Sequence, residues 1–140
     1  MDVSIYLFFK GNCLEAMQFY ADTLGGEITG VFKNGDAPNP ESRMPGGDEL
    51  VMNMAMKVGN LTIMASDAPG EWYSKPQGFD VVVSPTTLSE AERVFVALSK
   101  DAEEIRQPLG ETFWAERFAM LTDRFGTRWM VNYSGSKAQG

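Results

Sequence analysis

The stretch GNCLEAMQFYADTLGG, residues 11–26, decides the fold because it has the pattern of one amphipathic helix with a clear beginning and end. Its apolar side chains recur at helical spacing, at Leu14, Met17, Ala21 and Leu24. Asn12 followed three residues later by Glu15 resembles a capping box, and the pair Gly25-Gly26 is typical of a helix end. We therefore predict a helix that buries one face against a sheet.

The same helix pattern returns 75 residues later in the chain. The matching pairs are Glu15-Ala16 with Glu90-Ala91 and Phe19-Tyr20 with Val94-Phe95. Thr87 and Glu90 also form a second capping box at the start of this helix. This internal match predicts two copies of one structural module.

Short apolar runs on both sides of each helix predict the strands of these modules. The runs are 3–9, 27–32, 50–58 and 61–66 in the first half, and 79–84, 103–109, 117–122 and 127–133 in the second. Gly59-Asn60 and residues 123–126 predict tight hairpins. We predict an α+β protein of two tandem βαβββ modules, about 1–75 and about 76–135, in a single domain over 1–135. Residues 136–140 are predicted to be a disordered tail.

The composition excludes several classes of function. The chain has no histidine and only one cysteine, Cys13, which excludes Ser-His-Asp and Cys-His catalysis, an internal disulfide and any CxxC site. A net charge of −7 argues against nucleic acid as a partner. No apolar run reaches the length of a membrane span, and no basic segment leads into an apolar one at the N-terminus. We therefore expect a cytoplasmic protein that contacts neither nucleic acid nor membrane.

Four phrases give the chain a family resemblance: GNCLEAMQFY (11–20), IMASDA (63–68), ETFW (111–114) and DRFGTRWMVN (123–132). Together they resemble the PhnB-like branch of the vicinal oxygen chelate superfamily, which includes glyoxalase I, extradiol dioxygenases and bleomycin-resistance proteins. The resemblance covers about residues 3–133 and implies the glyoxalase/bleomycin-resistance fold, in which curved mixed sheets surround a cavity, and a homodimer. The branch is also labelled 3-demethylubiquinone methyltransferase-like, but no Gly-rich nucleotide loop follows a strand in this sequence.

The resemblance also implies where a metal site would lie. Metal-dependent relatives place a His, Gln or Glu at one point on each of four strands. The matching positions here are Ile5, Met64, Phe79 or Asp80, and Met130. Only Asp80 offers a hard donor, and a lone carboxylate does not hold a catalytic divalent ion. We therefore predict that the metal site is lost and that the protein needs no cofactor.

Strand alternation predicts which side chains replace such a site. If Met64 faces a cavity, then Asn53 and Ser66 share its face, while Leu61 and Ile63 pack beneath a helix. The candidates for ligand binding are Asn53, Met64, Ser66, Trp114, Arg128, Met130 and Asn132. The alternatives are that the two methionines fill a closed core, that Asn53 only bonds across the strands, and that Trp114 with Phe113 forms a dimer or core contact.

Three other features have a functional and a structural interpretation. The aperiodic loop 34–50 is either a binding loop or simply mobile. Cys13 lies in the first turn of a helix, where a thiol can become reactive, but a small buried residue is the simpler interpretation. Asp67 and Asp123 are predicted to cap their own turns.

Two functions follow from these residues, with a third kept open. The first is a metal-free binding protein whose methionine-lined cavity holds a small, partly apolar molecule. The alternative is a metal-independent lyase, isomerase or hydrolase that uses Glu111, Glu116 or Asp80 with Arg117 or Arg128. The third is a structural partner of another protein. Candidate anchors for a homodimer are Trp72, Tyr73 and Trp114.

Overall fold

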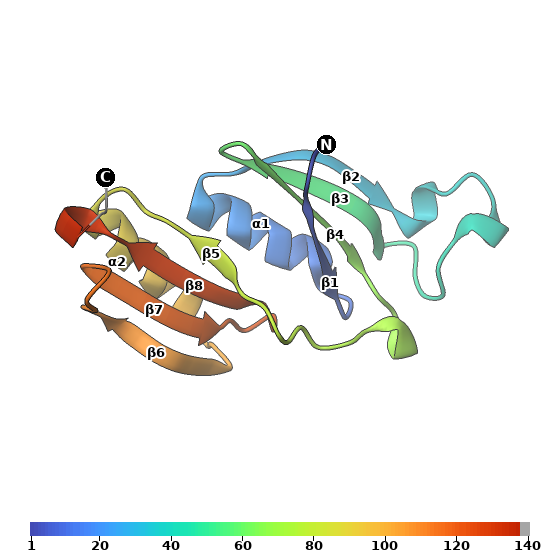
Figure 1. Cartoon of the computed structure of the whole chain (residues 1–140). Helices are drawn as coiled ribbons and strands as arrows, with labels where there is room; N and C mark the ends of the chain where they lie inside the picture. The colour runs from blue at the N-terminus through green and yellow to red at the C-terminus, as the bar shows by residue number, and fades with distance from the viewer. Residues whose placement is uncertain (138–140) are drawn as a thin grey trace. The chain divides into compact units, whose positions relative to one another are not determined.

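The computed structural model describes residues 1–137 and divides the chain into two compact units, Met1–Ser74 and Lys75–Gly140. Each unit has one helix packed on a four-stranded mixed sheet (Figure 1). This confirms the prediction of an α+β protein with tandem βαβββ modules. That the two units form a single domain stays a prediction.

The first unit has its strands in the order β1-β4-β3-β2. Its elements are β1 (Ile5–Phe9), α1 (Cys13–Leu24), β2 (Glu27–Lys33), β3 (Val51–Val58) and β4 (Leu61–Asp67). β1 runs parallel to β4, and the other pairs are antiparallel. The helix buries Ala16, Met17 and Tyr20, and the sheet buries Met54 and Met56. α1 covers one face of this sheet, and the face opposite to the helix is called the open face below.

The second unit repeats this order as β5-β8-β7-β6. Its elements are β5 (Val81–Val83), α2 (Leu88–Ser99), β6 (Glu104–Gly110), β7 (Arg117–Thr122) and β8 (Arg128–Tyr133). Burial alternates along β8, since Trp129 and Val131 are buried while Arg128, Met130 and Asn132 are half-buried. The predicted common face of these last three residues is therefore confirmed.

The two helices begin in different ways, and one prediction about them is wrong. Thr87 caps α2 by accepting a hydrogen bond from Glu90 N at 3.1 Å. Asn12 makes no capping bond to α1. Instead, Asp67 Oδ1 accepts hydrogen bonds from Gly11 N at 2.9 Å and Cys13 N at 3.0 Å. The carboxylate takes over the cap because β4 runs beside β1 and ends at the start of α1.

Two predicted boundaries also change. Residues 136 and 137 are not disordered, because they belong to a 3-10 turn, η4 (Gly135–Lys137), in which Ser136 Oγ bonds Glu116 Oε1 at 3.1 Å. Residues 138–140 lie outside the described part of the chain. The strand predicted over 79–84 is shorter and spans Val81–Val83. Before it, the Phe79 carbonyl accepts a hydrogen bond from the Arg128 side chain, with an Nε–O distance of 3.1 Å. No helix within residues 1–137 is both long enough and apolar enough to cross a membrane.

Candidate ligand-binding site

The open face of the first sheet brings together the candidates of the first module. Met64 pairs with Ala55 on β3 and with Tyr6 on β1, and Asn53 Nδ2 donates to Tyr6 Oη at 3.4 Å. The neighbour of Met64 is thus Tyr6 rather than Ile5, which pairs with the buried Ile63. Ile5 therefore lies on the opposite face of the sheet from Met64. The strand register does not support placing the first metal position of the relatives at Ile5. Leu61, predicted to pack beneath the helix with Ile63, is exposed instead because it begins β4 beside the turn.

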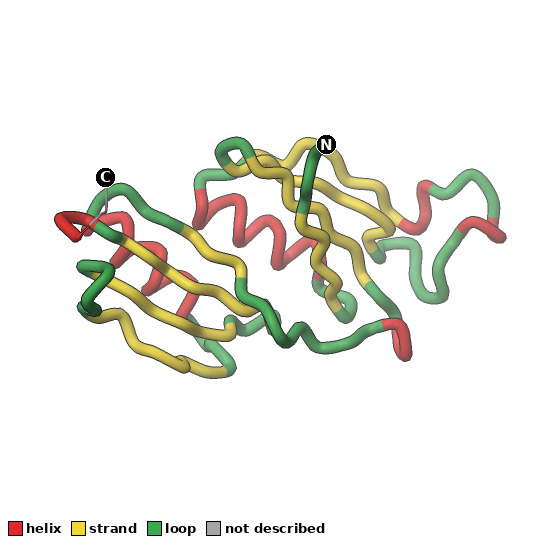
Figure 2. The backbone as a smooth tube through the Cα atoms, in the orientation of Figure 1, coloured by secondary structure: helices red, strands yellow, loops and turns green. Residues whose placement is uncertain are grey.

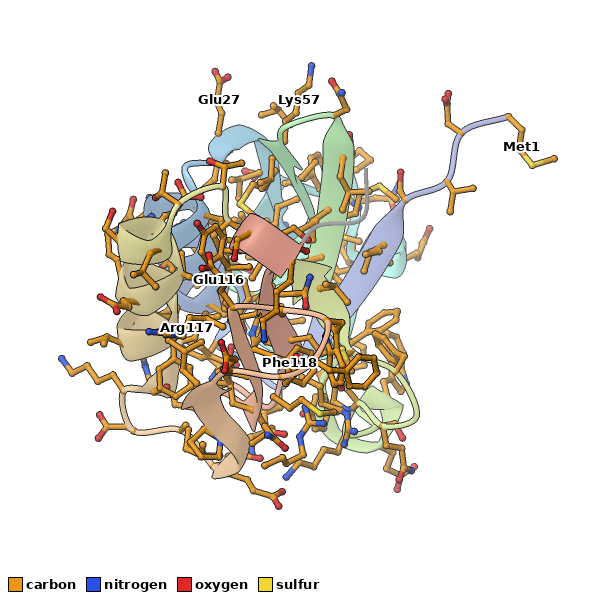
Figure 3. The ribbon with its side chains drawn as sticks, turned by 60° about the vertical axis from the view of Figure 1, so that its left-hand side comes forward. Met1, Glu27, Lys57, Glu116, Arg117 and Phe118 are labelled. Atoms are coloured by element: carbon orange, nitrogen blue, oxygen red, sulfur yellow. The ribbon has the colours of Figure 1, made fainter. Side chains whose placement is uncertain are left out.

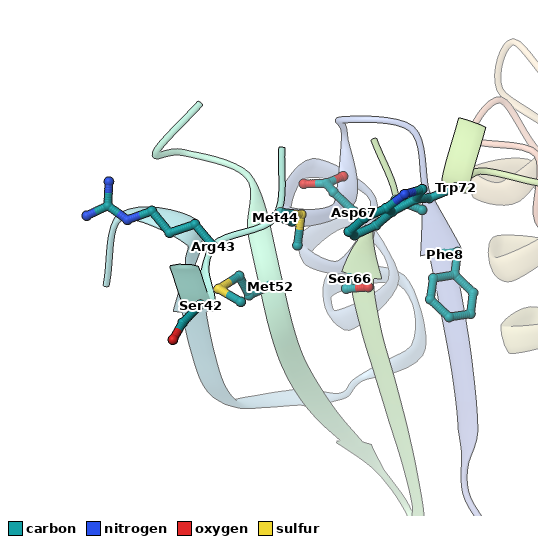
Figure 4. Close-up of a pocket in the computed structure, with 9 residues that line it drawn as sticks. Phe8, Ser42, Arg43, Met44, Met52, Ser66, Asp67 and Trp72 are labelled. Atoms are coloured by element: carbon teal, nitrogen blue, oxygen red, sulfur yellow. The ribbon is translucent and has the colours of Figure 1, made fainter. Parts of the chain in front are cut away.

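A pocket of about 300 Å³ opens at the end of this sheet. Its lining residues are Phe8, Ser42, Arg43, Met44, Met52, Ser66, Asp67, Ala68 and Trp72. Figure 4 shows Phe8 and Trp72 on one side, Met52 with Ser42 and Arg43 on the other, and Ser66 between them. Ser66 is the one sequence candidate that lines this pocket. Met44 and Trp72 were missed because the segments before β3 and after β4 have no periodicity that assigns their side chains to a face. Met52 was missed because alternation along β3 places it on the face opposite to Asn53.

The loop 34–50 forms one wall of the pocket and is held in place by Asn34. It contains two short 3-10 turns, η1 (Asn34–Asp36) and η2 (Pro40–Ser42) (Figure 2). The fully buried Asn34 side chain donates to Met44 O at 3.0 Å and accepts from Met44 N at 3.0 Å. Its amide also lies within hydrogen-bond distance of the carbonyls of Gly46 and Gly47. These bonds fix the position of Met44 against the pocket.

Asp67 lies at the pocket but has a structural role. Besides the two amides at the start of α1, its Oδ2 accepts a hydrogen bond from Val51 N at 2.9 Å. Asp67 is therefore structural as expected, but it does not cap its own turn. Its neighbour Cys13 is fully buried, and burial, helped by the Asp67 carboxylate, raises the pKa of the Cys13 thiol. The raised pKa disfavours the thiolate, so the reactive interpretation of Cys13 loses its support.

In the second unit, Asp80 forms a buried ion-pair cluster with two arginines. Arg106 grips both carboxylate oxygens, with Nη1–Oδ2 and Nη2–Oδ1 distances of 3.1 Å. Arg128 Nε donates to Asp80 Oδ1 at 2.9 Å. The side chain of Asp80 is only 6% exposed, against 15% for Arg106 and 29% for Arg128. Sequence reasoning missed Arg106, which lies where the register of β6 is irregular, between Ile105 and Gln107.

The other candidates of the second unit lie along β8. Met130 pairs with Met120 on β7 and with Val82 on β5. The Trp114 indole donates to Asn132 Oδ1 at 3.2 Å and packs edge-on against Phe118, with ring centroids 5.1 Å apart. Trp114 therefore contacts both Asn132 on β8 and the aromatic ring of Phe118 on β7.

The carboxylates proposed for an enzyme already have partners. Glu111 pairs with Lys137 at 3.2 Å, and Glu116 accepts a hydrogen bond from Ser136. Arg117 donates to the backbone carbonyl of Glu116 at 2.7 Å, at the start of β7 (Figure 3). Each of these groups thus has a partner within the second unit, and so has Asp123, whose Oδ1 accepts hydrogen bonds from Phe125 N and Thr127 N in its turn. The predicted turn cap at Asp123 is thus observed.

The residues at the expected metal positions do not fit a divalent ion. Met64 and Met130 offer thioethers, which are soft and weak ligands for zinc, iron or manganese. Asp80 has both oxygens bound by guanidinium groups. Within residues 1–137, no three or more His, Cys, Asp or Glu side chains gather in a way that could hold a metal ion.

The comparisons with known proteins agree with this fold. The family model described as 3-demethylubiquinone-9 3-methyltransferase matches residues 1–132. The chain belongs to this family. It is the PhnB-like branch of the vicinal oxygen chelate superfamily, so the resemblance found in the sequence is confirmed. Protein YjdN of Escherichia coli is 33% identical over 94% of this chain and 95% of its own length.

Solved structures of other proteins show the same fold. Protein PA1353 from Pseudomonas aeruginosa is 37% identical, with a TM-score of 0.84 over 96% of this chain and 98% of that one. A putative 3-demethylubiquinone-9 3-methyltransferase, PhnB protein, from Bacillus cereus shares the fold with a TM-score of 0.76, 24% identity and coverage of 95% and 99%. The fosfomycin-resistance protein FosX from Listeria monocytogenes, solved as a variant with Mn(II) and a dihydroxypropylphosphonic acid, has a TM-score of 0.62, 12% identity and coverage of 98% and 94%.

Proposed function

We propose that this PhnB-like protein binds a small, partly apolar molecule in the pocket of its first unit, without a divalent metal. The observation that supports this best is the pocket itself, whose volume of about 300 Å³ lies at the lower end of the usual range for ligand sites. An apolar lining with a few polar groups is what such sites have in common, and Ser66 offers a hydroxyl among methionines and aromatic rings.

The exposed aromatic side chains of this pocket favour binding over a merely structural hollow. Trp72 is 62% exposed and Phe8 is 50% exposed, so water contacts a large apolar surface there. Covering that surface with an apolar ligand is favourable. Met44 and Met52 add flexible, polarizable side chains that adapt to the shape of different ligands. These features support a ligand with an apolar body and one hydrogen-bonding group.

A titration with the neutral fluorescent probe N-phenyl-1-naphthylamine tests this proposal. We expect saturable enhancement of its fluorescence by the wild-type protein, and an affinity at least roughly tenfold weaker in Trp72→Ala, since an exposed aromatic anchor is lost. Val96→Ala removes an exposed apolar side chain on α2 and serves as the control. Equal affinity of wild type and Trp72→Ala for the probe would show that the probe does not bind in this pocket, which would contradict the proposal.

The enzyme alternative has less support, because Asp80, Glu111 and Glu116 all hold structural partners. A general base must also lie within hydrogen-bond reach of the substrate, and none of these three carboxylates lines the pocket. Compounds that displace the probe but are recovered unchanged after long incubation would support the binding function. A compound that is consumed would support the enzyme. The predicted homodimer remains a proposal, which light scattering on the purified protein would test.

A further inference from the structure

The ion-pair cluster of the second unit holds more positive than negative charge. Arg106 and Arg128 each carry one positive charge, and Asp80 carries the single negative charge that pairs with both. Within residues 1–137, Asp80 is the one carboxylate at ion-pair distance from Arg128. Asp80 is largely removed from water, whereas 29% of the Arg128 side chain is exposed, so solvent or a bound anion can reach the positive charge that Asp80 does not balance. One positive charge of this cluster therefore lacks a protein partner.

The excess charge is directed outward at Arg128. Both Nη atoms of Arg106 donate to Asp80, and Nη2 also donates to the carbonyl of Leu121 at 2.9 Å. Arg128 uses only Nε, which donates to Asp80 Oδ1 and to the carbonyl of Phe79. Its two Nη atoms have no partner in the described part of the chain. The bonds at Nε hold the guanidinium plane in place and leave its outer edge free.

A fixed guanidinium edge is suited to a carboxylate. Its two parallel N–H groups match the two oxygens of a planar carboxylate, and one negative charge would balance the cluster. Thr122 on β7 pairs with Arg128, and the next residues on the same face are apolar: Met130 follows two residues later in β8, and Val82, which is 54% exposed, pairs with Met130. We propose that the outer edge of the Arg128 guanidinium binds the carboxylate of a small ligand whose apolar body lies against Met130 and Val82.

This site lies wholly in the second unit and does not depend on the pocket of the first. Sodium benzoate is the probe, because it joins one carboxylate to an apolar ring. In an NMR titration of the isotope-labelled full chain, at constant ionic strength against sodium chloride, we expect saturable shifts of the Arg128, Met130 and Val82 amides. Sodium phosphate in a parallel titration separates carboxylate from phosphate recognition.

Arg128→Gln should weaken benzoate binding by roughly tenfold or more, since it removes a charge-assisted pair of hydrogen bonds. Arg106 still grips Asp80 in this variant, and the amide spectrum shows whether the fold is kept. Arg128→Lys keeps the charge beside Asp80 but loses the planar edge, so it should also bind several-fold more weakly. Arg93→Gln removes the same charge from the exposed face of α2 and should bind as wild type does.

Three results would overturn the proposal. One is that chloride produces the same shifts as benzoate. Another is that Arg128→Gln, or Arg128→Lys where the first variant does not fold, binds benzoate as tightly as the wild type. The third is saturation by phosphate at lower concentrations than benzoate, which would replace the carboxylate by a phosphate.

Discussion

At the scale of single residues, Asp67 shows how one side chain can organise three backbone segments. Its two oxygens accept hydrogen bonds from the amides of Gly11, Cys13 and Val51, and the residue is 4% exposed. A carboxylate in this place also complements the positive end of the α1 dipole. Asp67 therefore acts by stabilising the folded state rather than by chemistry at the pocket.

Asp67→Ala should lower the free energy of unfolding by about 3 kcal/mol or more, because it leaves three amide donors without an acceptor. Urea denaturation followed by circular dichroism measures the change. Asp22→Ala, which removes an exposed carboxylate bonded, among residues 1–137, to Gln18 alone, should cost less than about 0.5 kcal/mol. Similar losses in the two variants would contradict the role given to Asp67.

Cys13 gives the protein a predictable response to alkaline pH. Its folded-state pKa is raised above the ordinary value of 9.0, so above that pH the unfolded chain releases the thiol proton and the folded chain retains it. The free energy of unfolding should then fall by up to about 1.4 kcal/mol per pH unit as pH rises above the unfolded pKa. Cys13→Ala should lose this part of the slope. Parallel slopes for the two proteins between neutral and alkaline pH would refute the assignment.

At the scale of elements, the sequence predicts best where the signal is local. Both helices and both hairpins were predicted within a few residues, because periodicity and turn residues act over short distances. The α1 cap was wrong because its partner, Asp67, lies more than fifty residues away in the chain. Arg106 was missed for the same reason, since its contact with Asp80 crosses the sheet where the strand register is irregular.

The loop 34–50 provides a prediction at this scale. Asn34→Ala removes the bonds that fix Met44, so the loop should open more often and the pocket should bind the naphthylamine probe more weakly. We expect trypsin to cleave after Arg43 roughly tenfold faster, which corresponds to about 1.4 kcal/mol of local stability.

Asn39→Ala is the matched control for this loop, because Asn39 is exposed and, in the part of the chain that the structure describes, its side chain bonds to Ser42 alone, in the turn η2. Its cleavage rate and probe affinity should stay close to those of the wild type. If both variants were cleaved at the same rate, Asn34 would not be the residue that holds the loop.

At the scale of the whole molecule, the two units share one topology but hold different groups. The first unit has a methionine-lined pocket at the end of its sheet, and the second has a cluster of two arginines and one aspartate. The sequence predicted the repeat, whereas the placement of Met64 and Met130 at metal positions stays a prediction from the family resemblance. It could not predict the pocket, because three of its lining residues come from an aperiodic loop.

The donor set predicts how the whole protein responds to metals. Protein purified without a histidine tag should contain far less than one equivalent of zinc, nickel, iron or manganese, because thioethers and an arginine-bound carboxylate are poor ligands for them. Chelator treatment should leave the melting temperature and the probe affinity unchanged. One tightly bound equivalent in elemental analysis would contradict the proposed metal independence.

The carboxylate of Asp67 has a further consequence for the order in which the first unit opens. Because one side chain holds amides from the start of α1 and the start of β3, any opening that moves the Asp67 carboxylate away from its place releases both segments. The amide protons of Gly11, Cys13 and Val51 should therefore exchange with solvent deuterium at similar free energies of opening. Two stretches of chain that lie about forty residues apart would thus behave as a single cooperative unit.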